Sequence, residues 1–472
     1  MPADLSLSLG AWHPELALSV GAMATLLCGV FIRRPFVPKL VAWLSLLWAA
    51  VGLHAATSPA APFFGLITLD AISLVFRWIA LGVVAIVALM VGSSRDVDSQ
   101  WTAEYLSLLL LLGVGLMLMA EANHLLMAYL AMELVSLSSY VLVGLARDIR
   151  SSEASLKYIL FGALSSGIML FGMSLLYGLT QDLSFSGIAT AIAGLPPSAL
   201  GAVGMAAALM LAGVAYKISM VPFHMWTPDV YEGAPIPVTA LLSVGPKAAG
   251  LALLLRLSGL FGPIWGPMST ALLVLTAITM TLGNLVALAQ TNVKRLLAYS
   301  TIGQVGYILI GITVKSSAGT AAILIYLIAY LFMNLGAFAC VVAVWNQTRD
   351  ESLEAFRGLA RRAPALAFCL TVFLLSLAGI PPLVGFLGKF FLFGSAIEAQ
   401  RTGLAIAGIL NSAIALYYYV NIVRLMYLHP SSTTEPVRAP LSLRLAVGVC
   451  AAGTILLGIF PSGLLAWIAS VV

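Results

Sequence analysis

The sequence predicts an all-α polytopic membrane protein with about fourteen transmembrane helices, including two inverted five-helix repeats that each contain one broken helix. Composition is the first observation: the 472 residues are 61% hydrophobic and 9% charged, with a mean hydropathy of +1.06. Apolar runs of about 20 residues, the signature of transmembrane helices, recur along the whole chain. Two runs are too long for one bilayer crossing and carry prolines near their middle, which predicts broken helices.

Charge and cysteine content exclude other classes of protein. The net charge of +5 comes from short loops and not from a basic domain, so no nucleic-acid partner is expected. The four cysteines are scattered without CxxC pairing, which predicts neither a disulfide framework nor a metal cluster. Glu15 begins the first apolar run and no small-residue cleavage site follows it, so we expect a retained helix and not a signal peptide.

Apolar periodicity places the helices in order and groups them into four parts. The predicted spans are 13–32, 38–56, 67–93, 102–120, 124–145, 155–180, 199–231, 236–258, 267–290, 295–314, 318–346, 363–398, 402–428 and 443–470. We assign residues 1–100 to three N-terminal helices, 101–260 to the first repeat, 261–430 to the second and 431–472 to a final helix. Corresponding spans in the two repeats lie five apart, and this odd offset reverses their direction through the membrane.

Basic residues in the loops predict the orientation. With an outer N-terminus, the outer loops hold Arg256, Lys315 and Arg401. The inner loops then hold Arg33, Arg34, Lys39, Arg95, Arg147, Arg150, Lys157, Lys294, Arg295, Arg349, Arg357, Arg361, Arg362, Arg438 and Arg444. The asymmetry predicts a multi-pass protein of the bacterial inner (cytoplasmic) membrane with both termini in the periplasm.

Three lysines lie inside apolar spans beside helix breakers. Lys217 precedes Pro222 in span 199–231, Lys247 follows Gly245-Pro246 in span 236–258, and Lys389 follows Pro381-Pro382 in span 363–398. An ammonium at membrane depth is costly and marks a functional site by default. Backbone opened by proline is tolerated there only against protein or water. The pattern therefore predicts a hydrated, proton-carrying path.

Glu133 is the carboxylate expected to work with these lysines. It lies near the middle of span 124–145, with Tyr129, Ser136 and Tyr140 at helical spacings around it. Burial disfavours a charged ammonium and a nearby carboxylate favours it. An ion pair at about 4 Å in a dielectric of about 20 contributes roughly 4 kcal/mol. We therefore expect Glu133 and Lys217 to form a pair whose opening turns the lysine from a proton holder into a proton donor.

Other polar residues have two interpretations each. His224 could relay protons or lie at the membrane interface. Asp229 and Glu232 could form a capped turn or collect protons. Arg77 is expected to contact a neighbouring subunit or a lipid headgroup, with a role in the channel as the alternative. The polar group Ser300, Thr301, Gln304 and Tyr307 stands where apolar residues are the norm. The run Tyr417-Tyr418-Tyr419 is interpreted as packing plus an aromatic contact.

Four motifs in order carry a specific resemblance. They are HMWTPDVYEGAP (224–235), LSVGPKAAG (242–250), QTNVKRLLAYSTIGQVGY (290–307) and SLAGIPPLVGFLGKF (376–390). Over residues 101–427 the chain resembles the antiporter-like membrane subunits of proton-pumping NADH:quinone oxidoreductase, respiratory complex I. The sequences of motifs 224–235 and 242–250 are most similar to those of the smallest of the three such subunits. The long C-terminal lateral helix of the largest subunit is not expected, because the chain ends after the last predicted span.

The resemblance implies a proton channel in each repeat, with Glu133, Lys217, Lys247 and Lys389 at the family's proton-carrying positions. Many relatives have histidine where this chain has Gln304, which cannot titrate. NADH, FMN, Fe-S clusters and quinone are expected in partner subunits, and this chain is expected to hold no redox site, cofactor or metal. Its implied partners are other membrane-arm subunits, including the neighbouring antiporter-like subunit, and lipids.

Alternative functions remain open at this point. The same repeat occurs in subunits of multisubunit Na+/H+ antiporters and of membrane-bound hydrogenases. A non-conducting scaffold would have to bury four ionisable residues at considerable cost. A free-standing solute transporter would need substrate-specific polar groups that the sequence does not show.

Overall fold

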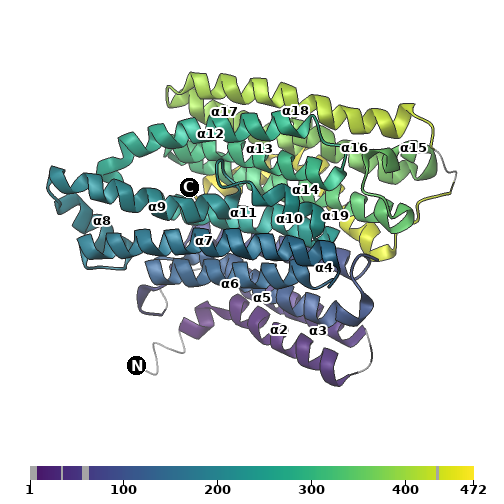
Figure 1. Ribbon diagram of the computed structural model, residues 1–472, viewed down its shortest axis with the longest axis horizontal. Coiled ribbons are helices and arrows are strands. Elements are labelled where there is room, and N and C mark those ends of the chain that lie inside the picture. Colours follow the sequence, from purple (N-terminus) through teal and green to yellow (C-terminus); the bar gives the residue numbers. More distant parts are fainter. Residues whose placement is uncertain (1–7, 33, 35, 56–62, 432–434) are drawn as a thin grey trace. The chain divides into compact units, whose positions relative to one another are not determined.

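Helices form nearly all of the structure, a computed structural model that describes residues 8–32, 34, 36–55, 63–431 and 435–472 (Figure 1). Among these residues, 13 helices are long and apolar enough to cross a membrane. This confirms the all-α polytopic fold. Arg33, one of the expected inner-loop residues, lies outside the described part of the chain.

The chain forms two compact units. Unit 1 comprises residues 1–85, 99–219 and 245–272, and unit 2 comprises residues 86–98, 220–244 and 273–472. The helices within unit 1 are α2 (His13–Phe31), α3 (Phe36–Ala55), α5 (Thr102–Glu121), α6 (Leu125–Gly144), α7 (Ile149–Thr180), α8 (Phe185–Gly194) and α9 (Leu200–Ile218). Those within unit 2 are α10 (Trp226–Gly233), α13 (Val293–Val314), α14 (Ser317–Thr348), α15 (Leu359–Arg362), α16 (Pro364–Ala378), α17 (Val384–Glu398), α18 (Thr402–Leu428), α19 (Leu441–Ile459) and α20 (Ser462–Ala469). The helices α4 (Ala71–Val91), α11 (Ile236–Ser258) and α12 (Trp265–Ala287) have residues in both units.

Each unit has its own packing order. In unit 1, α2 packs against α3 and α5, α5 against α6, α6 against α7, and α7 against α9. In unit 2, α14 contacts α13, α16, α17 and α19. Helix α14 is therefore the central element of unit 2, and most of its side chains are buried.

Both long predicted spans are interrupted, as expected. Span 199–231 consists of α9 and α10, and span 363–398 consists of the 15-residue helices α16 and α17. Because neither α16 nor α17 reaches spanning length alone, the count of long apolar helices is 13 where about fourteen spans were predicted. The ten-residue helix α8 was not predicted, since its apolar run is too short for a span.

The helix breaker beside Lys247 does not interrupt its helix. Helix α11 continues through Pro246 without interruption. A proline removes one backbone donor, but the neighbouring hydrogen bonds of a 23-residue helix hold it together on both sides.

Local structure recurs in the two halves of the chain. His124 caps α6 and forms an isolated bridge with Ser184, and Asn292 caps α13 and forms the same kind of bridge with Ser352. The next helix in each case, α7 or α14, has 32 residues and ends at a left-handed residue with φ 55°. The interrupted pairs α9–α10 and α16–α17 follow. Equivalent local features therefore recur in the same order in the two halves of the chain.

Candidate functional site

Lys217 occupies the last turn of α9, where the chain leaves the helix. Ser219 adopts a left-handed conformation at φ 64° and ends α9 there. The Lys217 side chain is 1% exposed, and its Nζ donates a 2.8 Å hydrogen bond to Ser136 Oγ on α6. Ser136 in turn donates to the Met132 carbonyl at 2.7 Å, so its oxygen is left as an acceptor for the ammonium.

Glu133 lies one turn before Ser136 on α6. It is partly buried, and its charge acts on Lys217. Within the described residues the two side chains form no direct ion pair, because Ser136 takes the contact with the ammonium. The predicted Glu133–Lys217 relationship is thus electrostatic at a distance, and the opposite charges still favour the ammonium form.

Lys247 completes a group of three ionisable residues in unit 1. Its side chain lies on α11 and is 0% exposed, and its charge interacts with that of Lys217. Unit 1 therefore brings together the three predicted residues from α6, α9 and α11. Two buried ammonium groups within each other's field are difficult to keep charged at the same time.

Tyrosines on α6, α7 and α9 extend this group. The Tyr140 hydroxyl hydrogen-bonds to Ser136, and the Tyr140 and Tyr158 rings meet edge to face at 4.7 Å. Tyr216 donates a 2.9 Å hydrogen bond to the Tyr158 carbonyl. Gly162 leaves room for the Tyr140 hydroxyl, which a Cβ at that position would strike. Tyr158 and Tyr216 were not predicted, because neighbours on different helices are not visible as sequence spacing.

Lys389 lies in unit 2 at the second interruption. Its Nζ donates to the carbonyl of Ala378, the last residue of α16, at 3.0 Å, and to Ser412 Oγ on α18 at 3.1 Å. The same ammonium lies 4.3 Å from the centre of the Tyr307 ring on α13, a cation–π contact. The break between α16 and α17 thus supplies a free carbonyl that stabilises the buried ammonium.

Glycines allow α16 and α17 to meet at this break. Gly379 has φ +92°, which side-chain-bearing residues rarely adopt, and a Cβ there would lie 2.9 Å from Lys389 Cδ. A Cβ at Gly385 would strike the Ser376 carbonyl. Both positions require glycine because the backbones and the lysine stem come close together.

Gln304 is the centre of a polar network in unit 2. Its Nε2 donates to the Leu377 carbonyl and to Tyr419 Oη, each at 3.1 Å, and its Oε1 accepts from Tyr326 Oη. Counted from the helix caps His124 and Asn292, Ser136 and Gln304 occupy the same position on α6 and α13.

Tyrosines of α18 take part in the same network. The predicted packing and aromatic contact are present, because Tyr418 and Tyr419 are buried and their ring centroids lie 4.4 Å apart. Their hydrogen bonds were not predicted. Tyr419 hydrogen-bonds to Gln304, and Tyr418 donates a 2.9 Å bond to Asn284 Oδ1. Asn284 also donates to Tyr307 Oη at 2.9 Å. Tyr417 is 70% exposed.

The chain is similar to known membrane proteins over nearly its whole length. Residues 122–415 match the family described as NADH:quinone oxidoreductase/Mrp antiporter, TM. The chain belongs to the NADH:quinone oxidoreductase/Mrp antiporter family. The match includes every lysine and glutamate of the two groups described above.

Relatives in this family bear the name expected from the motifs. NADH-quinone oxidoreductase subunit N of Anaeromyxobacter sp. strain Fw109-5 is 40% identical, covering 98% of this chain and 96% of the relative. Subunit N 2 of Sorangium cellulosum is 45% identical over 96% of this chain and 95% of the relative. The predicted resemblance to subunit N, the smallest antiporter-like subunit, is confirmed.

Solved structures in the comparison share the fold. A chain of respiratory complex I from Thermus thermophilus with bound Aureothin has a TM-score of 0.83 and 34% identity, covering 96% of this chain and 98% of that chain. A chain of the Mrp complex from a Dietzia species has a TM-score of 0.86 over 98% of this chain and 97% of that chain. At 22% identity, the second likeness concerns the fold alone.

His224 lies in unit 2 between α9 and α10 and is 8% exposed. It is therefore not at the surface of its unit, and a bond to the Pro222 backbone holds its side chain. Asp229 and Glu232, on α10, both pair with Arg295 of α13, at 2.9 and 2.7 Å. These two carboxylates fix α10 to the start of α13, as the capped-turn interpretation requires.

Arg77 contradicts its prediction. The side chain is 2% exposed and forms ion pairs with Glu15 and Glu121 inside unit 1. A contact with a lipid headgroup or another subunit would need an exposed guanidinium. Sequence spacing could not reveal this group, because its members come from α2, α4 and α5.

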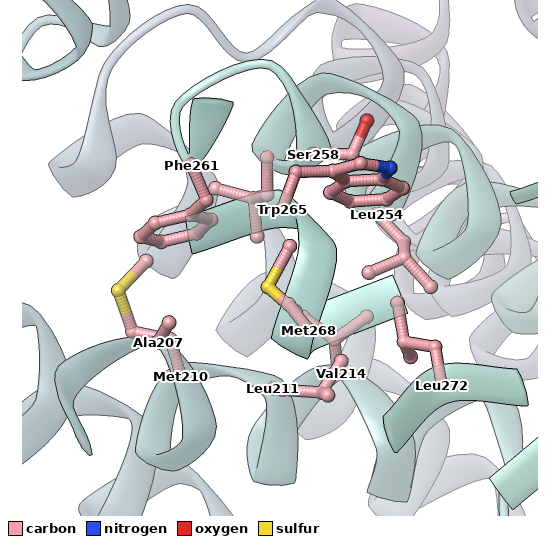
Figure 2. A pocket seen from close by; sticks show the side chains of 11 residues that line it. Ala207, Met210, Leu211, Val214, Leu254, Ser258, Phe261, Trp265, Met268 and Leu272 are labelled. Atoms are coloured by element: carbon pink, nitrogen blue, oxygen red, sulfur yellow. The ribbon is translucent and has the colours of Figure 1, made fainter. Parts of the chain in front are cut away.

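A separate pocket, partly open to solvent, lies beside the middle of α9 in unit 1 (Figure 2). Side chains of α9, α11 and α12 point into it, among them Met210 and Met268, together with Phe261 from the loop after α11. Ser258 and Trp265 supply the polar side-chain atoms of its lining. Because its lining is mostly apolar, the pocket suits an apolar ligand and not proton transfer.

Proposed function

We propose that this chain is the antiporter-like, proton-translocating subunit N of an NADH:quinone oxidoreductase. The observation that supports it most directly is the pair of lysines in unit 1, Lys217 and Lys247, fully buried and within each other's electric field. Paired opposite charges would be the cheaper way to fill a static site. Two buried ammonium groups instead suit a site in which the number of bound protons changes.

Glu133, Lys217 and Lys247 act as a relay in this proposal. With Glu133 charged, the ammonium of Lys217 is favoured. When the field of Glu133 weakens, Lys217 releases its proton toward Lys247, whose own charging is easier once Lys217 is neutral. The Nζ–H bond of Lys217 breaks and an Nζ–H bond forms on Lys247, so charge is conserved within the pair.

Lys389 serves the second half of the chain. We propose that it exchanges protons with the outer side of the membrane, held at the α16–α17 break by the Ala378 carbonyl and Ser412. His224 is proposed as a relay toward the inner surface, since its buried imidazole can both accept and donate a proton.

The proposed role as a complex subunit also implies a location, partners and cofactors. We propose a multi-pass location in the bacterial inner membrane with both termini periplasmic, supported by the basic residues of the loops. The partners are other membrane-arm subunits, including the neighbouring antiporter-like subunit, and lipids. NADH, FMN, Fe-S clusters and quinone belong to partner subunits, so this chain acts as part of a translocase.

Replacement of Lys217 tests the proposal. In the assembled complex in proteoliposomes, K217A should abolish most proton translocation coupled to NADH oxidation, while K217R, which keeps a cation, should lose less. Undiminished NADH oxidation and proton gradient in K217A would falsify the relay.

A second candidate is a subunit of a multisubunit Na+/H+ antiporter, because the matching family includes Mrp antiporters. Identification of copurifying subunits distinguishes the two: peripheral redox subunits support the oxidoreductase, and their replacement by other antiporter subunits supports the alternative. A non-conducting scaffold would leave proton flux unchanged in K217A.

A further inference from the structure

A second buried ionic group lies in unit 1, apart from the lysines of the proposed relay. Arg77 Nε and Nη2 donate to the two carboxylate oxygens of Glu15 at 2.8 and 2.7 Å. Arg77 Nε is also 2.9 Å from Glu121 Oε1. The exposed fractions of the three side chains are 2%, 0% and 0%. We call Glu15, Arg77 and Glu121 the acid pair cluster.

The charges of the acid pair cluster do not balance. A guanidinium is always protonated, so it neutralises one carboxylate and leaves a second one in a dry site. An uncompensated buried charge is strongly destabilising. Two carboxyl groups that share a site avoid this by retaining one proton between them.

The geometry of Glu121 supports a bound proton. Its carboxyl and the Glu15 carboxyl both lie against the Arg77 guanidinium, at 2.9 and 2.7 Å, so they are close neighbours that repel each other unless one of them carries a proton. Neither oxygen of Glu121 has a hydrogen-bond partner in the described part of the chain, although the side chain is fully buried. A buried carboxylate oxygen without a hydrogen-bond partner destabilises the folded state unless it is protonated.

Two further charged side chains, Arg256 and Asp70, lie between the same end of α5 and the surface of the unit. Arg256 Nε donates to the carbonyl of Ala120, the residue before Glu121, and its charge acts on the Glu121 carboxyl. The Arg256 guanidinium forms a double hydrogen bond to Asp70, with lengths of 3.0 and 3.1 Å. Asp70 is 35% exposed and Arg256 15%, so this pair joins the cluster to the surface of the unit.

We propose that the acid pair cluster is an exchangeable proton-binding site, shared by Glu15 and Glu121 and opening toward Asp70. In the loaded state one carboxyl oxygen carries the proton, and Arg77 balances the remaining carboxylate. In the unloaded state that O–H bond has broken, the proton has passed to water near Asp70, and the cluster holds one net negative charge. Arg256, which cannot deprotonate, stabilises the unloaded state.

The position of the acid pair cluster indicates the side of the membrane with which it exchanges protons. Arg256 lies at an end of α11 assigned to the outer side by the distribution of basic residues, and Asp70 and Glu121 lie with it. The cluster is therefore a release site on the outer side for protons moved by unit 1. Only this assignment of direction rests on the proposed function, since proton binding itself follows from the charge count.

Infrared difference spectroscopy of the purified, assembled complex tests the proposal. Light water and heavy water are compared for the parent and for E121Q, E15Q and the control E398Q, which changes an exposed glutamate at the end of α17. The parent should show the carbonyl-stretch band of a protonated buried carboxylic acid that shifts in heavy water. E121Q or E15Q should remove that band, and E398Q should retain it. The same E121Q and E15Q complexes should lose proton translocation severalfold in proteoliposomes.

A band and proton flux unchanged in both glutamine variants would overturn the site and leave a static ionic cluster. A band that disappears but never shifts in heavy water would equally overturn exchange. If E121Q does not assemble, E121D keeps a carboxyl and should move the band, and an unmoved band is again contrary to the proposal. Failure of the relay would appear separately, as unchanged proton flux in K217A beside an altered band in E121Q.

Discussion

Lys217 donates its 2.8 Å hydrogen bond to Ser136, while Glu133, one turn away on the same helix, acts on that ammonium without touching it. A direct ion pair would have to break before Lys217 could release its proton, at a cost of roughly 4 kcal/mol. A neutral hydroxyl partner holds the lysine in place at a smaller cost. The separation of the two tasks, holding by Ser136 and tuning by Glu133, suits a proton carrier that must change state repeatedly.

Ser136→Ala should weaken the hold on the ammonium. A hydrogen bond to a charged group contributes about 1.5–3 kcal/mol, so the distribution of protons on Lys217 should change by about tenfold or more. We expect proton translocation in proteoliposomes to fall while the complex still assembles. Ser138→Ala is the matched control, because Ser138 is also buried on α6 but has no contact with Lys217 among the described residues. Equal rates in the two variants would argue against a role for Ser136.

Glu133→Gln should act on the same lysine through the field alone. The substitution removes the charge but keeps the shape, so proton translocation should drop without loss of assembly. Because Ser136 and Glu133 act on one ammonium, the effects of E133Q and S136A on the logarithm of the translocation rate should not be additive in a double-mutant cycle. Strict additivity would show that the two side chains act on different steps.

Gly379→Ala should disturb the second site through geometry. A non-glycine residue at φ +92° is strained, and the new Cβ would lie 2.9 Å from Lys389 Cδ. We expect a lower melting temperature of the assembled complex and slower proton translocation. The control is Gly394→Ala on α17, where a Cβ meets nothing within 4 Å and alanine is the better helix former. If the two variants behave alike, Lys389 does not depend on the shape of the break.

The sequence was sufficient to predict the buried lysines and the helix breaks beside them, because proline, glycine and charged residues inside apolar spans are visible in the sequence. Lys217 and Lys389 stood beside breaks, and both breaks are present. Pro246 shows that a proline alone does not mark a break, because one missing donor does not open a long, buried helix. The Tyr158 and Tyr216 contacts and the ion pairs of Arg77 could not be predicted, since each joins residues of different helices whose packing is not encoded as a spacing.

Gln304→Leu should destabilise unit 2. The substitution leaves the Leu377 carbonyl and Tyr326 Oη without their hydrogen-bond partner in a buried site, at a cost of about 1–3 kcal/mol for each group. Gln304→His keeps one donor and one acceptor and should lose less. The melting temperature of the assembled complex provides the comparison. If leucine is tolerated as well as histidine, the amide network does not contribute to stability.

The cap of α6 should respond to pH. His124 Nδ1 accepts the Leu126 N–H at 3.2 Å, which requires a neutral ring on that nitrogen. Burial lowers the pKa of His124 from its usual 6.5, against the opposing charge of Asp182. Because the folded state binds the proton less well than the unfolded state, the cap stabilises α6 fully above the usual pKa and is lost as pH falls through the lowered value.

Hydrogen exchange of the first turn of α6 in the assembled complex can measure this effect. After correction for the intrinsic exchange rate, protection of the Leu126 amide should fall between neutral pH and about pH 5 in the parent. In H124N the amide oxygen caps the helix without titrating, so protection should not depend on pH. A parent whose protection is equally independent of pH would mean that the ring is not the group that holds this amide.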